Sequence, residues 1–111
     1  MTDKIVVFST CSGEEEAVSV ARALVEAQLA ACVNIIPQIR SIYRWKGAID
    51  EDTEWLLVIK TKRDLFSALA AKLRTVHSYE VPEAIALPVV DGLPEYLAWI
   101  DSESLQSPAV P

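Results

Sequence analysis

One extended segment in the middle of this chain constrains the fold more than any other feature. Within residues 32–61, two runs rich in β-branched and aromatic side chains flank a turn centred on Gly47. At about 3.3 Å per residue the first run alone reaches about 45 Å, whereas a globule of this length has a radius of gyration of only roughly 13 Å. We therefore expect a β-hairpin that protrudes from its own domain. Its apolar residues Ile42, Tyr43 and Trp45 then require another chain to cover them.

The segments around the hairpin predict a mixed domain of helices and strands. In order, we expect strand 4–11, helix 13–31, hairpin strands 32–45 and 54–61, helix 65–76, strand 81–90 and a short helix from Pro94. The order β-α-β-β-α-β-α begins with the six elements of the ferredoxin-like split βαβ pattern. The expected fold class is therefore an α+β, ferredoxin-like sandwich with a long protruding β-hairpin.

Local signals predict where these elements begin and which faces they bury. Ser12 followed by Glu15 predicts a capping box for the first helix, and Asp64 predicts the cap of the second. Pro37 interrupts the first hairpin strand and indicates an edge or a bulge. The first helix is expected to bury a stripe of Val18, Ala21, Val25 and Leu29, with Ala17 and Leu24 beside it. The second is expected to bury Leu65, Phe66, Leu69, Leu73 and Val76.

Length and charge restrict the class of protein. The chain has 111 residues, which fits a single domain over 1–103, and the polar, proline-containing segment 104–111 is expected to be disordered. A net charge of −6 disfavours nucleic-acid binding, which depends on basic residues. No apolar run approaches the length needed to span a bilayer, so we expect no membrane role.

Two cysteines are too few for a disulfide framework. Cys11 and Cys32 are expected to be free thiols in a reducing cytoplasm, although a single bridge between them is the alternative. No secretory signal is recognised before the first strand. The expected location is therefore the cytoplasm.

Seven short segments occur in the order seen in one protein family. They are STC (9–11), LAACVN (29–34), SIYRWKG (41–47), IKT (59–61), HSYEVPE (77–83), ALP (86–88) and PEYLAWI (94–100). Together they resemble the CutA divalent-cation tolerance family over nearly all of residues 4–101. The resemblance implies a ferredoxin-like protomer in a homotrimer joined through edge strands. It also implies a small cytosolic protein involved in tolerance to copper and other divalent metals.

The resemblance implies one alternative function, and this chain departs from the family pattern at one position. The CutA assembly is similar to that of PII signalling proteins, which implies, by analogy of fold, a module that binds a small-molecule effector in clefts between subunits. The family commonly has proline where this chain has Ser78. Serine frees the φ angle and restores a backbone donor, so we expect a looser turn beside His77.

Cys11 is the first candidate metal ligand. It precedes a predicted helix N-terminus, where the helix dipole lowers the pKa of a thiol, and a thiolate suits Cu(I) better than hard cations. The resemblance places the family's proposed copper-binding cysteine at the same residue. The alternative is a small buried cysteine at the end of a strand. Cys32, in apolar surroundings, is interpreted as a structural thiol.

His77, the only histidine, is the second candidate ligand. One histidine cannot complete a site within one chain, so three copies would converge in a trimer, or Glu80 or Glu83 of a neighbour would join it. The alternative is a histidine whose charge favours a helix C-terminus. The tentative metal ligands are therefore Cys11, His77 and Glu80, for copper or another divalent metal.

A second group of residues is expected to line a cleft between subunits. Its members are Tyr43, Trp45, Lys60, Tyr79 and Glu83. The aromatic members are equally interpreted as interface packing. The neighbouring acidic residues of the hairpin are interpreted as a solvated tip and not as a divalent-ion site, because they lack calcium-loop spacing; they are Asp50, Glu51, Asp52 and Glu54.

An enzyme is not expected. The chain has no GxSxG elbow, P-loop, GxGxxG or HExxH motif. Cys11 and His77 form a nominal nucleophile and base, but no third residue is evident to orient them. We assign no catalytic residues.

Overall fold

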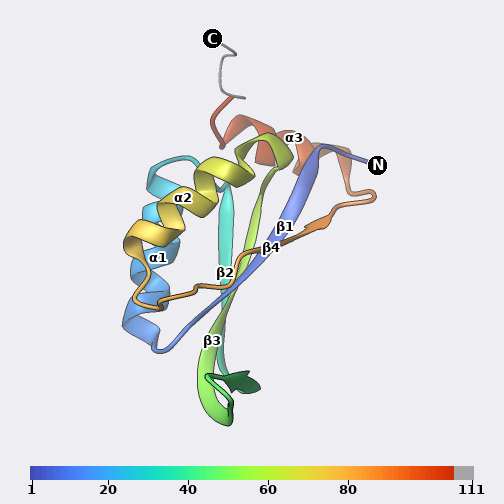
Figure 1. Ribbon diagram of the computed structural model, residues 1–111. Coiled ribbons are helices and arrows are strands. Elements are labelled where there is room, and N and C mark those ends of the chain that lie inside the picture. Colours follow the sequence, from blue (N-terminus) through green and yellow to red (C-terminus); the bar gives the residue numbers. More distant parts are fainter. Residues whose placement is uncertain (107–111) are drawn as a thin grey trace.

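A single antiparallel sheet organises the molecule, as the ribbon in Figure 1 shows for a computed structural model in which residues 1–106 are described. The elements are β1 (Lys4–Cys11), α1 (Glu14–Glu26), β2 (Cys32–Trp45), β3 (Ala48–Lys62), a 3-10 turn (Arg63–Leu65), α2 (Phe66–Val76), β4 (Ile85–Pro88) and α3 (Pro94–Ser102). The strand order is β2-β3-β1-β4. This order and the βαββαβ connectivity confirm the predicted α+β, ferredoxin-like fold. None of the helices among residues 1–106 is long and apolar enough to cross a membrane.

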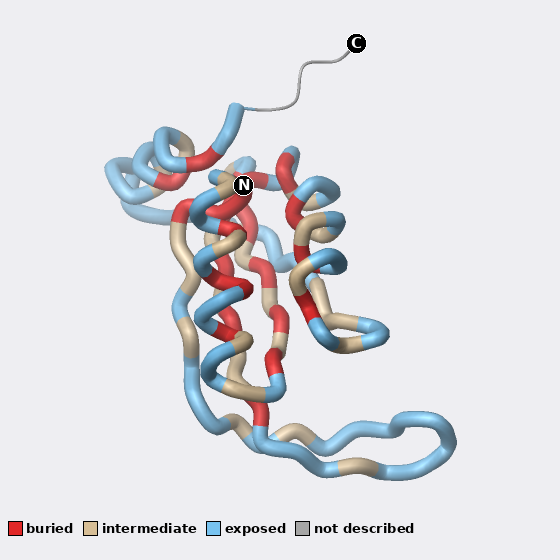
Figure 2. The backbone as a smooth tube through the Cα atoms, turned by 90° about the vertical axis from the view of Figure 1, so that its left-hand side faces the viewer, coloured by how far each residue is buried: buried red, intermediate tan, exposed pale blue. Residues whose placement is uncertain are grey.

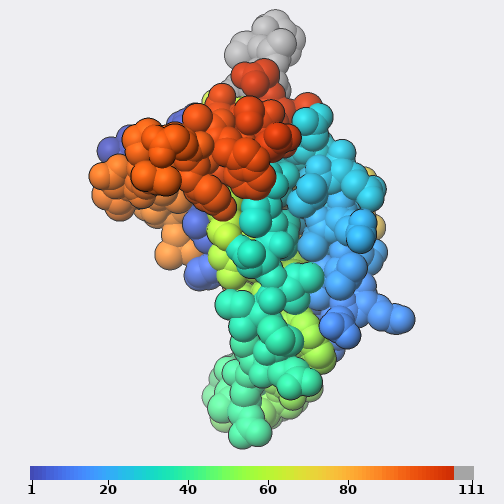
Figure 3. Space-filling view, turned by 180° about the vertical axis from the view of Figure 1, so that it is seen from behind, coloured from blue at the N-terminus to red at the C-terminus, as the bar shows by residue number. Residues whose placement is uncertain are grey.

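The two faces of the sheet differ in what covers them. Residues that pair directly across the strands share a face, so the alternation along β1 separates the two sides. Helices α1 and α2 pack on one side and bury Val7, Leu57 and Ile59 completely. On the opposite side, α3 is the only helix among residues 1–106, and it lies across one end and leaves β2 uncovered (Figure 3). The apolar residues of this open face are Val6, Phe8, Ile36, Leu56, Val58, Ile85 and Leu87.

The hairpin formed by β2 and β3 protrudes from the body as predicted. Figure 2 shows it turning away from the sheet with almost every residue exposed. Ile42 is 66% exposed and Trp45 is 39% exposed. The pairing of β2 with β3 shifts between Ile36 and Ile39, which confirms the bulge that Pro37 predicts. A bulge bends and twists its strand, and this bend directs the hairpin away from the sheet.

The turn of the hairpin is shorter than expected. It contains only Lys46 and Gly47, whose φ angles of 49° and 82° are those of a type I′ turn. Strand β3 then begins at Ala48, so Asp50 and Asp52 belong to the strand and not to a loop. Their side chains are therefore placed by strand pairing.

Helix α1 differs from its prediction at both ends and in its buried face. Its N-cap is Gly13, with no side-chain cap from Ser12, and it ends at Glu26 instead of Ala31. Gln28 has a φ of 57°, the left-handed conformation that ends helices and usually takes glycine, so the sequence carries no visible stop signal. The buried residues are Ala17, Val20, Ala21 and Leu24, whereas Val18 and Val25 are 40% and 41% exposed. Ala21 and Leu29 are therefore buried as predicted, whereas the buried face is centred toward Ala17 and Leu24 and leaves Val18 and Val25 exposed.

Two other predictions were wrong in their boundaries. Asp64 lies inside the 3-10 turn, and the N-cap of α2 is Leu65. Strand β4 covers only Ile85–Pro88 of the predicted 81–90, because only these residues pair with β1. The buried side of α2 is as predicted, with Leu69 and Leu73 almost fully enclosed.

The C-terminal segment docks back on the domain through charge and backbone contacts. Asp101 of α3 lies 3.7 Å from Lys4 Nζ and 3.5 Å from Lys62 Nζ, and both lysines are buried. Of the predicted disordered tail 104–111, Ser104 is buried and the N–H of Leu105 donates to Gln28 O at 2.9 Å. Residues 107–111 lie outside the described part of the chain.

Candidate functional site

Three potential metal ligands from three elements meet at one end of the sheet. Cys11 ends β1, Glu16 lies in the first turn of α1, and His77 directly follows α2. One ligand atom from each residue lies within 4.8 Å of the others. Cys11 Sγ is 3.7 Å from His77 Nε2. The structure thus brings two predicted ligands together and adds Glu16, which the sequence analysis missed.

The hydrogen bonds of His77 assign its tautomer. Nε2 lies 2.7 Å from the carbonyl oxygen of Thr10, which can only accept, so Nε2 carries the proton. Nδ1 accepts a hydrogen bond from the backbone N–H of Tyr79 at 3.1 Å. Both ring nitrogens are therefore engaged by the backbone. Because Nε2 carries its own proton, it cannot take the proton of the Cys11 thiol in this arrangement.

The prediction that Cys11 has a lowered pKa was wrong. Burial, followed by the nearby charges of Glu16 and Glu54, raises the pKa of the thiol to about 12. Cys11 is completely buried beneath the helices, and the α1 N-terminus at Glu14 does not offset this desolvation. Cys11 is therefore a protonated thiol at neutral pH and becomes a ligand only when a metal displaces its proton.

Glu16 completes this group. Burial raises the pKa of this carboxyl, but hydrogen bonds from Ser78, the electrostatic influence of His77 and a hydrogen bond from Ser12 together hold it below its ordinary value. Ser78 N–H donates to Glu16 Oε2 at 2.8 Å, and this is the backbone donor that a proline at that position would lack. Glu16 Oε1 is buried and has no hydrogen-bond partner, so one carboxylate oxygen is available to a cation.

Glu80 was predicted to join His77 from a neighbouring subunit, and within one chain it lies apart from the three-ligand cluster. Its side chain is 70% exposed and forms an ion pair with Lys46 of the hairpin turn at 3.8 Å. The connector after His77 turns outward, because the N–H of Tyr79 is held on the histidine ring. Glu80 therefore faces the hairpin of its own chain, and Glu16 is the acidic residue that this chain itself brings to Cys11 and His77.

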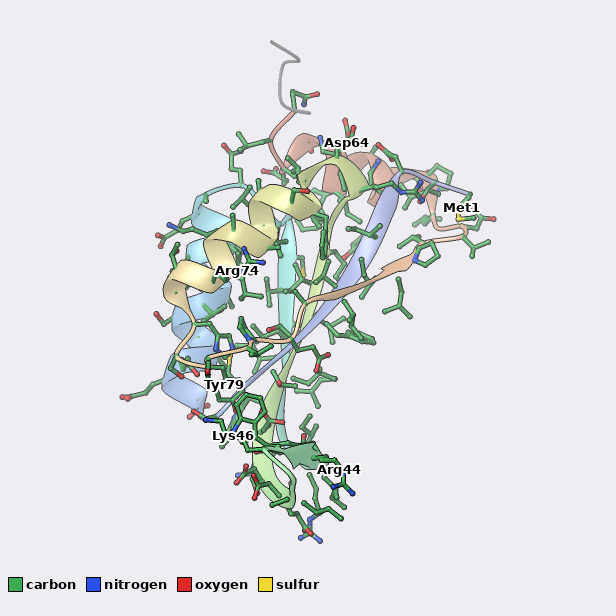
Figure 4. All side chains as sticks on the ribbon, viewed as in Figure 1. Met1, Arg44, Lys46, Asp64, Arg74 and Tyr79 are labelled. Carbon is green, nitrogen blue, oxygen red and sulfur yellow. The ribbon has the colours of Figure 1, made fainter. Side chains whose placement is uncertain are left out.

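A cleft lies between the hairpin and the connector that follows α2. Its volume is about 870 Å³, and its lining includes Tyr43, Trp45, Tyr79 and Glu83. In Figure 4, Tyr79 and Lys46 lie next to one another where the connector meets the hairpin. Four of the five predicted cleft residues are thus gathered within one chain. The fifth, Lys60, is absent from the lining and donates a short hydrogen bond to Asn34 on the open face.

Glu54 is the residue of this cleft that the sequence analysis misinterpreted. It was assigned to a solvated tip, but it is only 7% exposed, and its Oε2 accepts a hydrogen bond from Tyr79 OH at 2.6 Å. Burial and this bond to Glu54 raise the pKa of the Tyr79 phenol. The period-two alternation of Glu54 with Leu56 and Val58 along β3 was the available signal that it faces other residues.

Comparison with known proteins identifies the family. The family model described as "CutA1 divalent ion tolerance protein" matches residues 5–103. The chain belongs to the CutA1 divalent ion tolerance family. The match covers β1 through α3 and therefore both the three-ligand cluster and the cleft.

Similar proteins come from distant organisms. The chain is 58% identical to mouse (Mus musculus) Protein CutA over 93 residues, which cover 84% of the chain and 52% of that protein. It thus spans about half the length of this relative. Among solved structures, Cut A1 from Thermus thermophilus matches with a TM-score of 0.89 at 46% identity, covering 91% of the chain and 98% of that structure. CutA1 from Oryza sativa matches with a TM-score of 0.91 at 41% identity, covering 94% and 95%.

The names of the relatives bear on two further predictions. An Arabidopsis thaliana relative that is 42% identical is called chloroplastic, and a structure from Archaeoglobus fulgidus is described as periplasmic. Location therefore differs within the family. All these relatives are CutA proteins and lend no support to the PII-like signalling alternative.

Proposed function

We propose that this CutA1-family chain contributes to divalent-metal tolerance by binding a copper ion, as Cu(I), through Cys11, Glu16 and His77. The observation that supports this proposal is the convergence of three ligand atoms within 4.8 Å. Each comes from a different element, so the fold itself assembles the group. Thiolate and imidazole are soft and borderline ligands that suit Cu(I).

The chemistry of the donor set fits a cation. Glu16 Oε1 is buried without a partner, which costs free energy unless something fills the position. A bound cation would satisfy this oxygen and stabilise the thiolate form of Cys11. Binding would also require His77 to release its hydrogen bond to Thr10 O. The site would therefore exchange protons for metal, and its affinity would rise with pH.

A competition titration tests this copper site. Cu(I) is titrated against a chromogenic chelator with the wild-type protein and with Cys11→Ser, Glu16→Gln and, as control, Cys32→Ser. Because removing even an outer partner of a metal ligand costs about 10-fold to 100-fold in affinity, Cys11→Ser should weaken binding by at least about 100-fold. Cys32 lies on the other face of the sheet, so its substitution should leave the affinity unchanged. Equal affinity for wild type and Cys11→Ser would rule out this site.

We also propose that the chain forms a homotrimer. Its support is the open face of the sheet, where Ile36, Ile85 and Leu87 are 45%, 55% and 43% exposed, together with the protruding hairpin. Exposed apolar residues that cluster on one face often mark a protein–protein interaction site. Light scattering should give about three times the chain mass of 12.2 kDa.

A matched pair of substitutions distinguishes assembly through the open face from a general effect of charge. Leu87→Asp places a carboxylate on the open face, and Val25→Asp does so on the outer side of α1, where Val25 is 41% exposed. Leu87→Asp should shift the scattering mass toward the monomer, whereas Val25→Asp should not. A wild-type monomer at micromolar concentration would refute the trimer.

We further propose a cytoplasmic and non-enzymatic protein. Both cysteines are unpaired, which suits a reducing compartment. The tautomer of His77 leaves Cys11 without a base, which disfavours nucleophilic catalysis. Fractionation of cells that express a tagged chain tests the location, and recovery in an oxidising compartment would contradict it.

A further inference from the structure

Ser78 links two of the three residues that form the proposed copper site. It directly follows His77 in the chain, and its backbone N–H donates to Glu16 Oε2 at 2.8 Å. Glu16 lies in the first turn of α1, whereas His77 is the C-cap of α2. This hydrogen bond therefore ties the side chain of one ligand to the segment that carries another, across a separation of 62 residues between Glu16 and Ser78.

The two oxygens of the Glu16 carboxylate have different surroundings. Oε2 accepts a charge-assisted hydrogen bond whose length lies in the range of strong bonds of this kind. Oε1 is buried and has no hydrogen-bond partner among residues 1–106. The carboxylate is therefore held through one oxygen, and the other is left to bind a cation together with Cys11 and His77.

Holding the carboxylate in this way favours metal binding for two reasons. A glutamate side chain has several rotatable bonds, and fixing its rotamer before a ligand arrives reduces the conformational entropy that binding costs. A single available oxygen also suits a soft ion with few ligands, whereas Ca²⁺ sites use about six to eight oxygens and often both oxygens of one carboxylate. The contact from Ser78 thus bears on both the affinity and the selectivity of the site.

We propose that Ser78 is a positioning residue of the copper site, whose backbone N–H holds Glu16 so that Oε1 faces Cys11 and His77. This role rests on the proposed function, because it concerns the same three ligands. Ser78 acts through Glu16 and does not itself bind the metal. The donor belongs to the backbone, so every residue except proline supplies it at this position.

Two substitutions of Ser78 separate the backbone donor from the side chain. Ser78→Pro removes the N–H as well as the hydroxyl, and Ser78→Ala, the matched control, removes only the hydroxyl. A proline restricts the residue before it to extended backbone angles, and His77 already has a φ of −97° and a ψ of 141°. Ser78→Pro therefore does not force His77 out of its present conformation. Thermal unfolding of the metal-free variants checks that each is folded.

Affinity for Cu(I) is measured by competition with a chromogenic chelator, for wild type and each Ser78 variant, with and without Glu16→Ala. Ser78→Pro alone should weaken binding by about 10-fold to 100-fold, the usual effect of removing a hydrogen-bond partner of a metal ligand, and Ser78→Ala by less than about fivefold. When Glu16 is already replaced, neither substitution should change the affinity by more than about twofold, because the carboxylate through which Ser78 acts is absent. A purely structural effect would persist in that background.

Hydrogen exchange of the Ser78 amide tests the contact without metal. Ser78 is exposed, so the protection of its amide depends on the bond to Glu16. Glu16→Ala should increase the exchange rate by at least about tenfold, as expected for a bond to a charged group. Glu15→Ala is the control, because it removes the neighbouring, exposed carboxylate and should change the rate by less than about twofold. This measurement remains decisive if Ser78→Pro does not fold.

An affinity that Ser78→Pro leaves unchanged, an equal loss with and without Glu16, or a Ser78 amide that exchanges equally fast in wild type and Glu16→Ala would overturn the role of Ser78. Copper binding that is lost in Glu16→Ala but kept in Ser78→Pro would contradict only this role and leave the copper site standing. Failure of the wild type to bind Cu(I) would instead contradict the copper site, and the role of Ser78 with it.

Discussion

The two halves of the β2–β3 ladder share one backbone pairing but differ in everything that packs on it. Near its base, Leu57 and Ile59 are completely buried beneath α1 and α2. Beyond the bulge at Pro37, Ile42 and Ile49 are 66% and 70% exposed on the same two strands. Strand pairing therefore sets the shape of the hairpin, whereas burial sets where the chain gains its stability. The base of the ladder holds the fold together, and the far half presents surface to ligands or partners.

The largest expected effect tests this division directly. Leu57→Ala removes a fully buried side chain at the base and should destabilise the protein by about 3 kcal/mol, through lost burial and a residual cavity. Ile49→Ala in the far half should change the free energy of unfolding by less than about 0.5 kcal/mol. Chemical denaturation at fixed protein concentration measures both. Both substitutions are made in the Leu87→Asp variant, in which no neighbouring subunit should cover the hairpin, and comparable losses there would contradict the difference between the base and the far half.

A comparable contrast is expected between the two thiols. Burial raises the pKa of Cys11 to about 12, whereas Cys32 is only half-buried, at the start of β2 on the open face. Because the thiolate is the reactive form, iodoacetamide at pH 8 should modify Cys32 at least about 100-fold faster than Cys11. Mass spectrometry of digested, time-quenched samples measures the two rates. A faster Cys11 would show that its end of the sheet opens to solvent, and denatured protein, in which both react alike, is the control.

The sequence anticipated features that depend on local patterns and missed those that depend on docking. The hairpin, its bulge and the order of elements follow from β-branched runs, Pro37 and helical periodicity, which are properties of neighbouring residues. The end of α1 was missed because Gln28 adopts a left-handed conformation without the usual glycine. Cys11 lay near a helix start as predicted, but its pKa depends on complete burial by other elements, which no local pattern reveals.

The candidate sites show the same limit. Cys11 and His77 were predicted as individual residues, but their partner Glu16 follows from how α1 docks beside the connector. Glu54 looked like part of a charged tip because its neighbours Asp50, Glu51 and Asp52 are all acidic. Its burial depends on Tyr79, which comes from a connector far along the chain. Such tertiary contacts are not specified by spacing within one segment.

Two tyrosine hydroxyls test the difference between buried and exposed parts of the hairpin with an effect of intermediate size. Tyr79 donates to the buried Glu54, so Tyr79→Phe removes the hydrogen bond of an enclosed carboxylate and should cost about 2 kcal/mol. Tyr43 donates to Asp52 on the exposed half of the hairpin, where water can replace it, so Tyr43→Phe should cost less than about 0.5 kcal/mol. The denaturant midpoints of both variants measure these two losses of stability. Equal costs would place the two carboxylates in similar surroundings.

The smallest effect concerns pH. The pKa of Glu83 is raised by burial and then by Glu54 above its ordinary value of 4.5, so the folded protein holds the proton of Glu83 at pH values where the unfolded chain has lost it. The stability that this proton confers is fully present below pH 4.5 and is lost as pH rises through the folded-state pKa. Glu83→Gln removes this dependence. It should therefore increase stability at pH 7 by less than about 1 kcal/mol, since the group is only half-buried, and the gain should shrink toward pH 4. Glu95→Gln, at an exposed site, controls for the change in net charge. If Glu83→Gln increased the stability equally at pH 4 and pH 7, the pKa of Glu83 would not be raised in the folded protein.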